Sequence, residues 1–518
     1  MHYKLPLIIV FMIFASSCTN IKKNGEKVEI LQAPQETEFE PEYKLVADSG
    51  FAAPALAKCN TDLRYLNQVV GWQVAWPRRW QGVVARGAPA AATGIQEWIV
   101  APKAIAASID QLRLGISRNQ TAPRPVVIRV HQQVRDLLVM LKQSHSKYLF
   151  TDTSNSAANE WNNLVQHEVV PAVSSFEQFL RREYLPASQQ SPGLYMLKGG
   201  AECFANAIAW WTSLSPELKD VDRIGWLYLN DSMAELLATG QLSDTAEGML
   251  AQLREKMAND QTTTHELIAV SKSALVRAEE SLPHVFSQKV LQPIVVEEMP
   301  GYMQGSAPAG YYGGAEGNTP ARYIINTSRP NERRLMAEVI AFHEGIPGHH
   351  LWNAYPRGKP VEFNNSGLSE GWAIYAEYLA DEMGLYGSIL DRQGMIAKHL
   401  WAASRLIVEP GLHLNGWSRE KAIRFMLNNT VMSRTEIEIE VDRYTSMPGQ
   451  SLSYILGANF ILTERRRAQK ILGSRFKLAE FHDVILLGGG RPLPQVRDDI
   501  GAWLDLKKSE LLGDSIKM

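Results

Sequence analysis

One short stretch organises this sequence: residues 341–351 read AFHEGIPGHHL. It holds three of the chain's 12 histidines, one carboxylate and a Pro-Gly pair. A histidine followed by a glutamate, with another histidine a short distance on, is how zinc hydrolases place two imidazole ligands and a general base on one element. The stretch therefore predicts that His343 is a zinc ligand and that Glu344 is the catalytic base.

The spacing of these histidines departs from the usual motif, in which they are one helical turn apart. Here the second histidine follows six or seven residues after the first. An unbroken helix would separate the pair by roughly 9–10 Å along its axis, but zinc binds nitrogen at about 2.0–2.1 Å. Proline cannot continue a helix interior, and glycine accepts the backbone angles of a kink. We expect a two-residue bulge at Pro347-Gly348, with His349 favoured over His350 as the second ligand.

A third ligand has to come from another element, because catalytic zinc takes three protein ligands and keeps one position open. Glu370 is the best candidate, since it opens the next predicted helix after a loop at residues 355–368. A carboxylate in the first turn of a helix is also favoured in its ionised form. Glu377, on the same helix face, is placed to orient a ligand imidazole. The predicted ligands of the Zn²⁺ cofactor are His343, His349 and Glu370.

The chain around this stretch is predominantly helical in pattern. Apolar residues recur at threes and fours through residues 125–143, 160–184, 264–285, 331–351, 382–409 and 418–432. Residues 299–327 interrupt this pattern with glycines and a short strand-like run at 322–327. The sequence predicts a mostly α fold with a small β-hairpin or short sheet near the metal site. In zinc peptidases such a strand holds the substrate backbone by strand addition, and an inert surface hairpin is the alternative.

The first residues indicate export. Lys4 precedes an apolar run at residues 5–15 that ends in ASSC at 15–18, a pattern typical of a secretory signal too short to span a membrane. Small residues directly before Cys18 resemble the lipobox of bacterial lipoproteins, which implies cleavage there and a lipid on Cys18. An ordinary signal peptide cut nearby is the alternative. The predicted location is periplasmic, with a lipid anchor in a bacterial membrane.

The predicted organisation has three parts: a signal peptide at residues 1–17, a polar tether at 18–50, and a single helical catalytic unit at 51–518. That unit is expected to have two lobes, with the metal site in residues 335–380. The net charge of −2 gives no basic field, so no nucleic-acid partner is expected. Whether Cys59 and Cys203 pair is left open by the sequence.

Two motifs together carry a family resemblance. HExxPGHHL at residues 343–351 and EGWAxYxE at 370–377 resemble the bacterial domain-of-unknown-function family eight-eight-five. Blocks at 411–417, 440–457 and 481–486 agree, so the resemblance covers about residues 60–503. That family is similar to helical zinc peptidases such as Taq-type carboxypeptidases, thimet oligopeptidase and angiotensin-converting enzyme. The resemblance implies a zinc-peptidase-like fold with a deep cleft. The chain departs from the family pattern at Glu409-Pro410.

The resemblance also implies roles for C-terminal residues. Related peptidases place a Tyr or His where it stabilises the oxyanion beside the metal, and Tyr454 is the best match. Arg443 is a candidate ligand for a substrate carboxylate, with an ion pair to Glu440 or Glu436 as the alternative. Tyr444 is a candidate pocket residue. Residues 309–312 with 325–327 resemble the family's substrate-side hairpin, which implies that Tyr311 and Tyr312 bind substrate.

These observations predict an exported zinc-dependent hydrolase, most simply a metallopeptidase that acts on short peptides. A zinc hydrolase of non-peptide esters or amides is the first alternative. A binding lipoprotein whose metal motif is degenerate is the second, although such a protein would not require both Glu344 and Glu370.

Overall fold

The computed structural model describes residues 44–45, 66–143, 146–152, 154–240, 243, 245–288, 292–304, 308–315, 320–357 and 365–516. The chain divides into Met1–Phe39 and a compact unit, Glu40–Met518. The predicted signal peptide, Cys18, most of the predicted tether and Cys59 lie outside the described residues. Lys44–Leu45 (β1), within the predicted tether, pairs antiparallel with Leu214–Ser215 (β2). Cys203 is disulfide-bonded.

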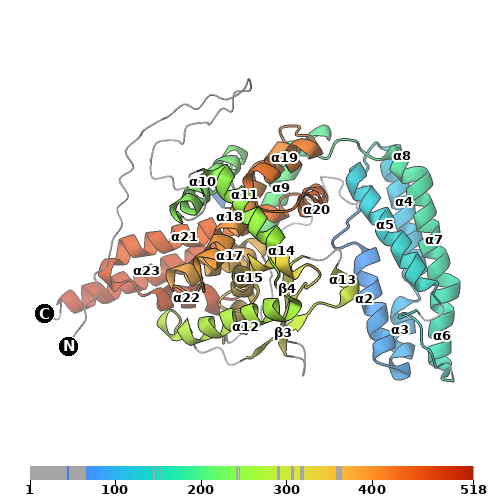
Figure 1. Cartoon of the computed structure of the whole chain (residues 1–518), viewed down its shortest axis with the longest axis horizontal. Coiled ribbons are helices and arrows are strands. Elements are labelled where there is room, and N and C mark those ends of the chain that lie inside the picture. The colour runs from blue at the N-terminus through green and yellow to red at the C-terminus, as the bar shows by residue number, and fades with distance from the viewer. Residues whose placement is uncertain are drawn as a thin grey trace. The chain divides into compact units, whose positions relative to one another are not determined.

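The prediction of a mostly helical chain is confirmed (Figure 1). Residues 72–187 form a group of helices with a core of their own, which includes the buried side chains of Trp80, Val130, Trp161 and Phe176. The helices of this group are α2 (Trp72–Ala85), α3 (Ala91–Trp98), α4 (Ala101–Ser117), α5 (Arg124–Leu141), α6 (Ser156–Leu164), α7 (Val170–Phe179) and α8 (Leu185–Ala187).

Two wide π-helical turns interrupt this group, and each has a proline as its cause. Val165–Val169 (η3) stands directly before the turn that contains Pro171, and Leu180–Tyr184 (η4) before the turn that contains Pro186. A proline has no N–H to donate, and its ring clashes with the carbonyl four residues earlier. A wider turn accommodates that clash without ending the helix.

Residues 200–516 carry the candidate metal residues. The helices of this part of the chain are α9 (Gly200–Thr212), α10 (Leu218–Ala238), α11 (Ala246–Asn259), α12 (Thr264–Ser281), α14 (Pro330–Arg334), α15 (Ala337–Glu344), α16 (His349–Ala354), α17 (Ser366–Glu382), α18 (Ile389–His413), α19 (Arg419–Asn429), α20 (Arg434–Ser446), α21 (Ser453–Leu472), α22 (Leu478–Leu487) and α23 (Leu493–Ile516). Helix α15 packs against α12, α17 and α18, and Ala337–His343 are all buried. It is therefore covered on several sides, as its nearly continuous apolar sequence requires.

Glycines bring α17 directly onto α21. A Cβ on Gly371 would lie 2.5 Å from the carbonyl carbon of Gly457, and a Cβ on Gly457 would lie 1.8 Å from the carbonyl oxygen of Gly367. No larger residue fits at these contacts. The close packing sets α17, which carries Glu370 and Glu377, against the helix that begins with Ser453-Tyr454.

The predicted short sheet is present, with one strand more than a hairpin. Its order is β3 (Ile294–Glu298), β5 (Ala321–Ile325), β4 (Gly310–Gly313), with β3 parallel and β4 antiparallel to β5. Strand β4 lies at the edge of this sheet and pairs Tyr311 with Ile324. A short helix, α13 (Gly301–Gln304), follows β3.

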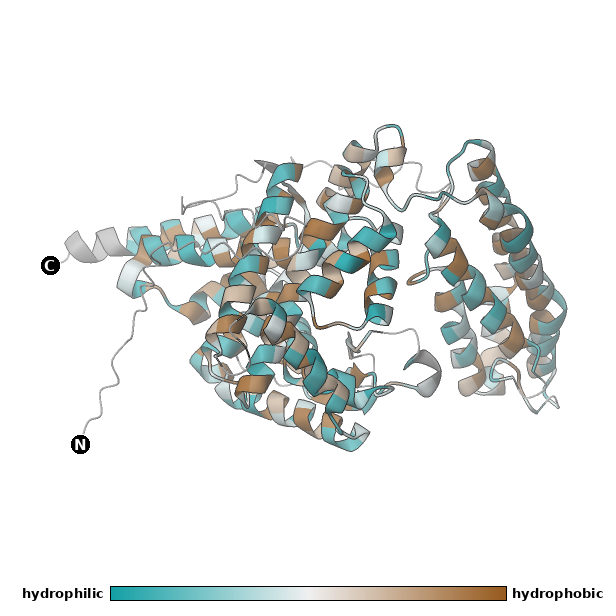
Figure 2. Cartoon of the chain, turned by 45° about the horizontal axis from the view of Figure 1, so that its top comes forward, coloured by the Kyte–Doolittle hydropathy of each residue, from teal (hydrophilic) through white to brown (hydrophobic). Residues whose placement is uncertain are grey.

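Apolar and polar residues alternate along the helices (Figure 2), and the apolar residues of the core cluster are buried. Helix α18 differs, because it is buried along most of its length and still carries Lys398, His399, Arg405 and Glu409 inside the protein. Within the described part of the chain, no helix is both long and apolar enough to cross a bilayer. The deep cleft, the two lobes and the zinc-peptidase-like fold stay predictions.

Candidate metal centre

The Pro-Gly pair does more than bulge the helix, because it splits the helix in two. Helix α15 ends at Glu344 and α16 begins at His349. In the turn between them, the N–H of Gly348 donates to the carbonyl of Phe342 at 2.9 Å. A Cβ on Gly348 would lie 2.0 Å from the carbonyl oxygen of His343. The predicted two-residue bulge is thus a break of four residues, which brings the chain back onto the end of α15.

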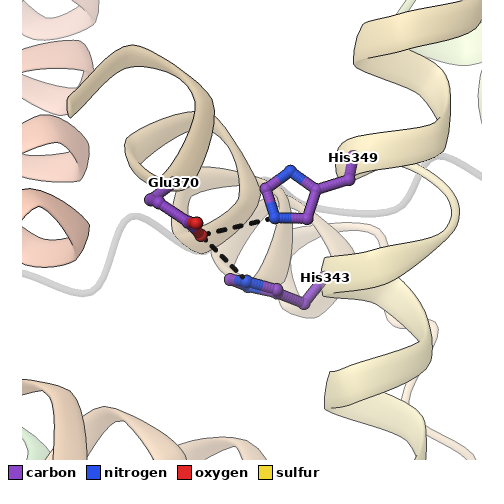
Figure 3. A group of neighbouring side chains, drawn as sticks. All are labelled: His343, His349 and Glu370. Atoms are coloured by element: carbon purple, nitrogen blue, oxygen red, sulfur yellow. Dashed lines mark ion pairs between the residues drawn. The ribbon is translucent and has the colours of Figure 1, made fainter. Parts of the chain in front are cut away.

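This break brings one of the two later histidines to His343. The Nε2 atom of His343 lies 3.4 Å from Oε2 of Glu370, and Nε2 of His349 lies 3.3 Å from the same oxygen (Figure 3). One ligand atom from each of the three residues lies within 4.8 Å of the others. Donors held at about 2.0–2.1 Å in a tetrahedron are separated by about 3.3–3.4 Å. The His–Glu separations therefore fit a shared divalent cation.

The state of Glu370 also fits a cation. Its Oε2 is buried and has no hydrogen-bond partner among the described residues, although two imidazoles stand beside it. Burial raises the pKa of Glu370, but His349 and His343 outweigh burial and hold that pKa well below its ordinary value. An ionised carboxylate oxygen without a hydrogen bond, facing two imidazole nitrogens, has the properties expected of a metal ligand.

One detail of the Glu370 prediction is wrong. Helix α17 begins at Ser366, capped by Asn365, whose side chain accepts from the N–H of Leu368. Glu370 therefore lies in the second turn of the helix, where the favourable field of the helix end has largely faded. Its ionised state depends on the two histidines and not on the helix terminus.

His350 has other partners. Its Nε2–H donates to the carbonyl of Gln292 at 2.9 Å, and its Nδ1 lies 3.4 Å from the hydroxyl of Tyr312. Burial lowers the pKa of His350, so the ring is neutral near pH 7. The structure thus places His349 beside His343 and Glu370, and uses His350 to connect α16 to the sheet.

Glu377 orients His343, as the sequence predicted. The Nδ1–H of His343 donates to Oε1 of Glu377 at 2.6 Å, which leaves Nε2 facing Glu370. Burial raises the pKa of Glu377, but Lys398 and the two histidines around it outweigh burial and hold that pKa well below its ordinary value. A carboxylate behind a ligand imidazole fixes its tautomer and ring orientation.

Glu344 and Tyr454 both lie beside this cluster. The ring of Tyr454 stacks on the His343 ring at 6.1 Å between centroids, with 10° between the planes. Burial and the charges of Glu370 and Glu344 raise the pKa of the Tyr454 hydroxyl, which therefore stays protonated. Glu344 is half-buried at the end of α15, and among the described residues its carboxylate has no hydrogen bond or ion pair.

The two tyrosines of β4 that were predicted to bind substrate lie on opposite faces of the strand. Tyr312 reaches His350, and burial raises its pKa to about 12. Tyr311, on the opposite face of β4, packs with the apolar cluster of Met299 and Ile324.

Arg443 is half-buried and Tyr444 is buried. Arg443 donates to both carboxylate oxygens of Glu440, at 3.1 and 2.8 Å, and to Gln450. Of the two alternatives from the sequence, the structure thus shows the ion pair with Glu440. Tyr444 is 0% exposed in a core cluster, and its role as a pocket residue stays a prediction.

Lys398 and His399 are part of this site, and the sequence analysis missed both. Each contacts Glu377 from α18, and both are buried. A Lys-His pair inside a long apolar helix pattern was a usable signal, because lysine is rarely buried without a partner.

The fold and the site together define a helical protein with a candidate His-His-Glu metal centre. The chain belongs to the DUF885 family, "Bacterial protein of unknown function", whose model matches residues 90–500. No curated protein matches the chain.

Two solved structures share the fold. One is "the putative lipoprotein from Colwellia psychrerythraea", with a TM-score of 0.75 and 24% identity over 85% of this chain and 80% of that chain. The other is "a putative lipoprotein of unknown function from Shewanella oneidensis", with a TM-score of 0.61 and 17% identity over 82% and 84%. At these identities the likeness concerns the fold alone.

Proposed function

We propose that this protein is a metal-dependent hydrolase, most simply a zinc peptidase that acts on short peptides. The observation that carries the proposal is the convergence of His343, His349 and Glu370 on one point, with a carboxylate, Glu344, directly beside the first ligand. Zinc bound there supplies a Lewis acid that polarises a carbonyl and lowers the pKa of water.

The chain's own residues supply the remaining chemistry. Glu344 has an unpaired, partly exposed carboxylate and accepts the proton of the attacking water. Tyr454, held by its stacking on His343, keeps its phenolic proton and donates a hydrogen bond to the oxygen that becomes negative. The outer edge of β4 pairs with no other described strand, and β4 is linked to α16 through Tyr312 and His350. This edge would hold an extended peptide by backbone hydrogen bonds.

The proposal includes export and a lipid anchor on Cys18. The apolar run at residues 5–15 and the small residues before Cys18 support it. The two structural neighbours are each described as a "putative lipoprotein", which agrees with the same location.

Two measurements test the proposed activity. Metal analysis of the purified protein is expected to give about one equivalent of zinc, and a value that stays below half an equivalent after zinc is added contradicts the proposal. Digestion of a peptide library is then compared between the wild type and Glu344→Gln. The variant is expected to keep its metal and to lose about 10²- to 10⁴-fold in rate, the usual contribution of a general base. Cleavage of esters without cleavage of any peptide would replace the peptidase by the first alternative.

A further inference from the structure

Glu377 accepts more hydrogen bonds than it would need to orient His343 alone. Its side chain is 0% exposed. One oxygen, Oε1, accepts from Nδ1–H of His343 and from Nζ of Lys398, and the other, Oε2, accepts from Nε2–H of His399 at 2.9 Å. Nζ of Lys398 lies 3.2 Å from Nδ1 of His343, so both nitrogens meet at the same oxygen.

The geometry fixes the carboxylate in three directions. Lys398 and His399 are neighbours on α18 and hold one oxygen each, so the carboxylate cannot rotate about its own axis. Helix α17 holds the other end of the side chain. The lone pair that remains on Oε1 faces Nδ1 of His343. The ring of His343 is therefore aligned from behind before any ligand reaches its Nε2.

Stability alone does not account for this lysine. A buried ion pair stabilises a fold little, and replacing such a pair by apolar residues of similar size is often neutral or favourable. Lys398 is only 7% exposed and lies in a helix that is buried along most of its length. Its position at the oxygen shared with His343 is what distinguishes it from a lysine that merely balances charge.

We propose that Lys398 is a positioning residue of the metal centre, which clamps Glu377 so that Nε2 of His343 is directed to the metal position. This inference rests on the proposed function, because it assumes that the three predicted ligands bind a divalent cation. It assigns Lys398 and His399, on a fourth helix, α18, to a site that the sequence motifs place on α15, α16 and α17 alone.

The test measures metal affinity directly. The metal-free protein is titrated with Zn²⁺ against a chelator of known affinity, and with Co²⁺ to record its visible absorption. Lys398→Met is expected to weaken Zn²⁺ binding by about 10- to 100-fold, as the loss of outer support of a ligand usually does. The Co²⁺ absorption bands are expected to shift, because the coordination geometry changes when the His343 ring is released.

Arg334→Met is the matched control. Nη1 of Arg334 lies 2.6 Å from Oδ1 of Asp391, a buried carboxylate also on α18, and so this variant removes a comparable ion pair away from the site. Its Zn²⁺ affinity and Co²⁺ bands are expected to match those of the wild type within threefold. Equal losses in both variants overturn the inference, because the effect would then be general destabilisation.

The remaining outcomes are separable. If the wild type binds one Zn²⁺ and Lys398→Met binds it within threefold, the positioning role is wrong and the proposed function stands. If the wild type binds no metal, both fail. Should Lys398→Met not fold, the double variant with Glu377→Gln removes the lone buried carboxylate and keeps an acceptor for His343. That variant is expected to bind at least tenfold more weakly than the wild type, and wild-type affinity overturns the inference.

Discussion

At the scale of single residues, Glu409 is a buried acid that hydrogen bonds and two nearby arginine charges support. It is 0% exposed on α18, accepts the backbone N–H of Gly449 at 2.6 Å and receives the hydroxyl of Ser451. Burial raises its pKa to about 7, although these two hydrogen bonds and the charges of Arg443 and Arg405 act the other way. Glu409 thereby holds the left-handed Gly449 turn that leads into α21.

This raised pKa predicts a pH dependence of stability. Because the folded protein binds the Glu409 proton more tightly than the unfolded chain does, the free energy of unfolding falls as pH rises from about 4.5 to about 7. Above that range the loss stays constant, at about 3 kcal/mol at most. In Glu409→Gln an amide replaces the protonated carboxyl, so this part of the slope is expected to disappear.

Urea unfolding at pH 5 and pH 8, followed by circular dichroism, measures the effect as the difference between the two proteins. The contributions of other titrating groups to the pH dependence cancel in that difference. One of them is His482, whose pKa burial lowers to about 3 and whose contribution has the opposite sign. Identical pH slopes for wild type and variant would show that Glu409 titrates at its ordinary value.

Individual residues also show how much of the site could be predicted from the sequence. That His343, His349 and Glu370 lie together could be predicted from the sequence, because ligand chemistry restricts which residues can share an ion. Lys398 and His399 were not connected to Glu377, since nothing in a single sequence shows which face of a distant helix meets another. The burial of Tyr444 was missed for the same reason.

At the scale of elements, the break between α15 and α16 depends on Gly348. Its backbone lies so close to α15 that a Cβ would come within 2.4 Å of the Phe342 carbonyl oxygen as well as that of His343. Gly348→Ala is expected to destabilise the fold by about 2–4 kcal/mol. It should also weaken Zn²⁺ binding, because the clash moves His349 away from His343.

Gly501→Ala is the control for this substitution. Gly501 lies inside α23, and a Cβ there meets nothing within 4 Å. Alanine is expected to stabilise that helix by about 0.5–1 kcal/mol. Thermal unfolding and Zn²⁺ titration of both variants provide the comparison. A Gly348→Ala protein with wild-type stability and affinity would mean that the turn has room to open.

The elements were predictable to different degrees. Helices with a clear apolar period, such as α12, began where the sequence placed them, because the capping box of Thr263 and Glu266 fixes the start. Strand β3 was missed, although its β-branched run lies between Pro293 and Pro300. Its partner β5 is parallel and more than 20 residues away, and parallel pairing leaves no turn signal between two strands.

At the scale of the whole molecule, the candidate metal centre belongs entirely to the compact unit that begins at Glu40. The three proposed metal ligands, and the residues that hold Glu377 and His343 in place, all lie within residues 343–399. Metal binding is therefore expected to be independent of the N-terminal segment. That segment is expected to serve location only, through the lipid proposed on Cys18.

Cys18→Ala separates location from chemistry. The wild type is expected to be labelled by palmitate and to need detergent for release from membranes, because several acyl chains together give stable anchoring where one does not. The variant is expected to lose the label and to keep wild-type Zn²⁺ affinity, since no residue of the metal centre changes. Ser17→Ala is the control, as it keeps a small residue before Cys18 and should be labelled normally. Label that persists in Cys18→Ala, or is absent from the wild type, would contradict the anchor and leave the metal centre to be judged by its own measurements.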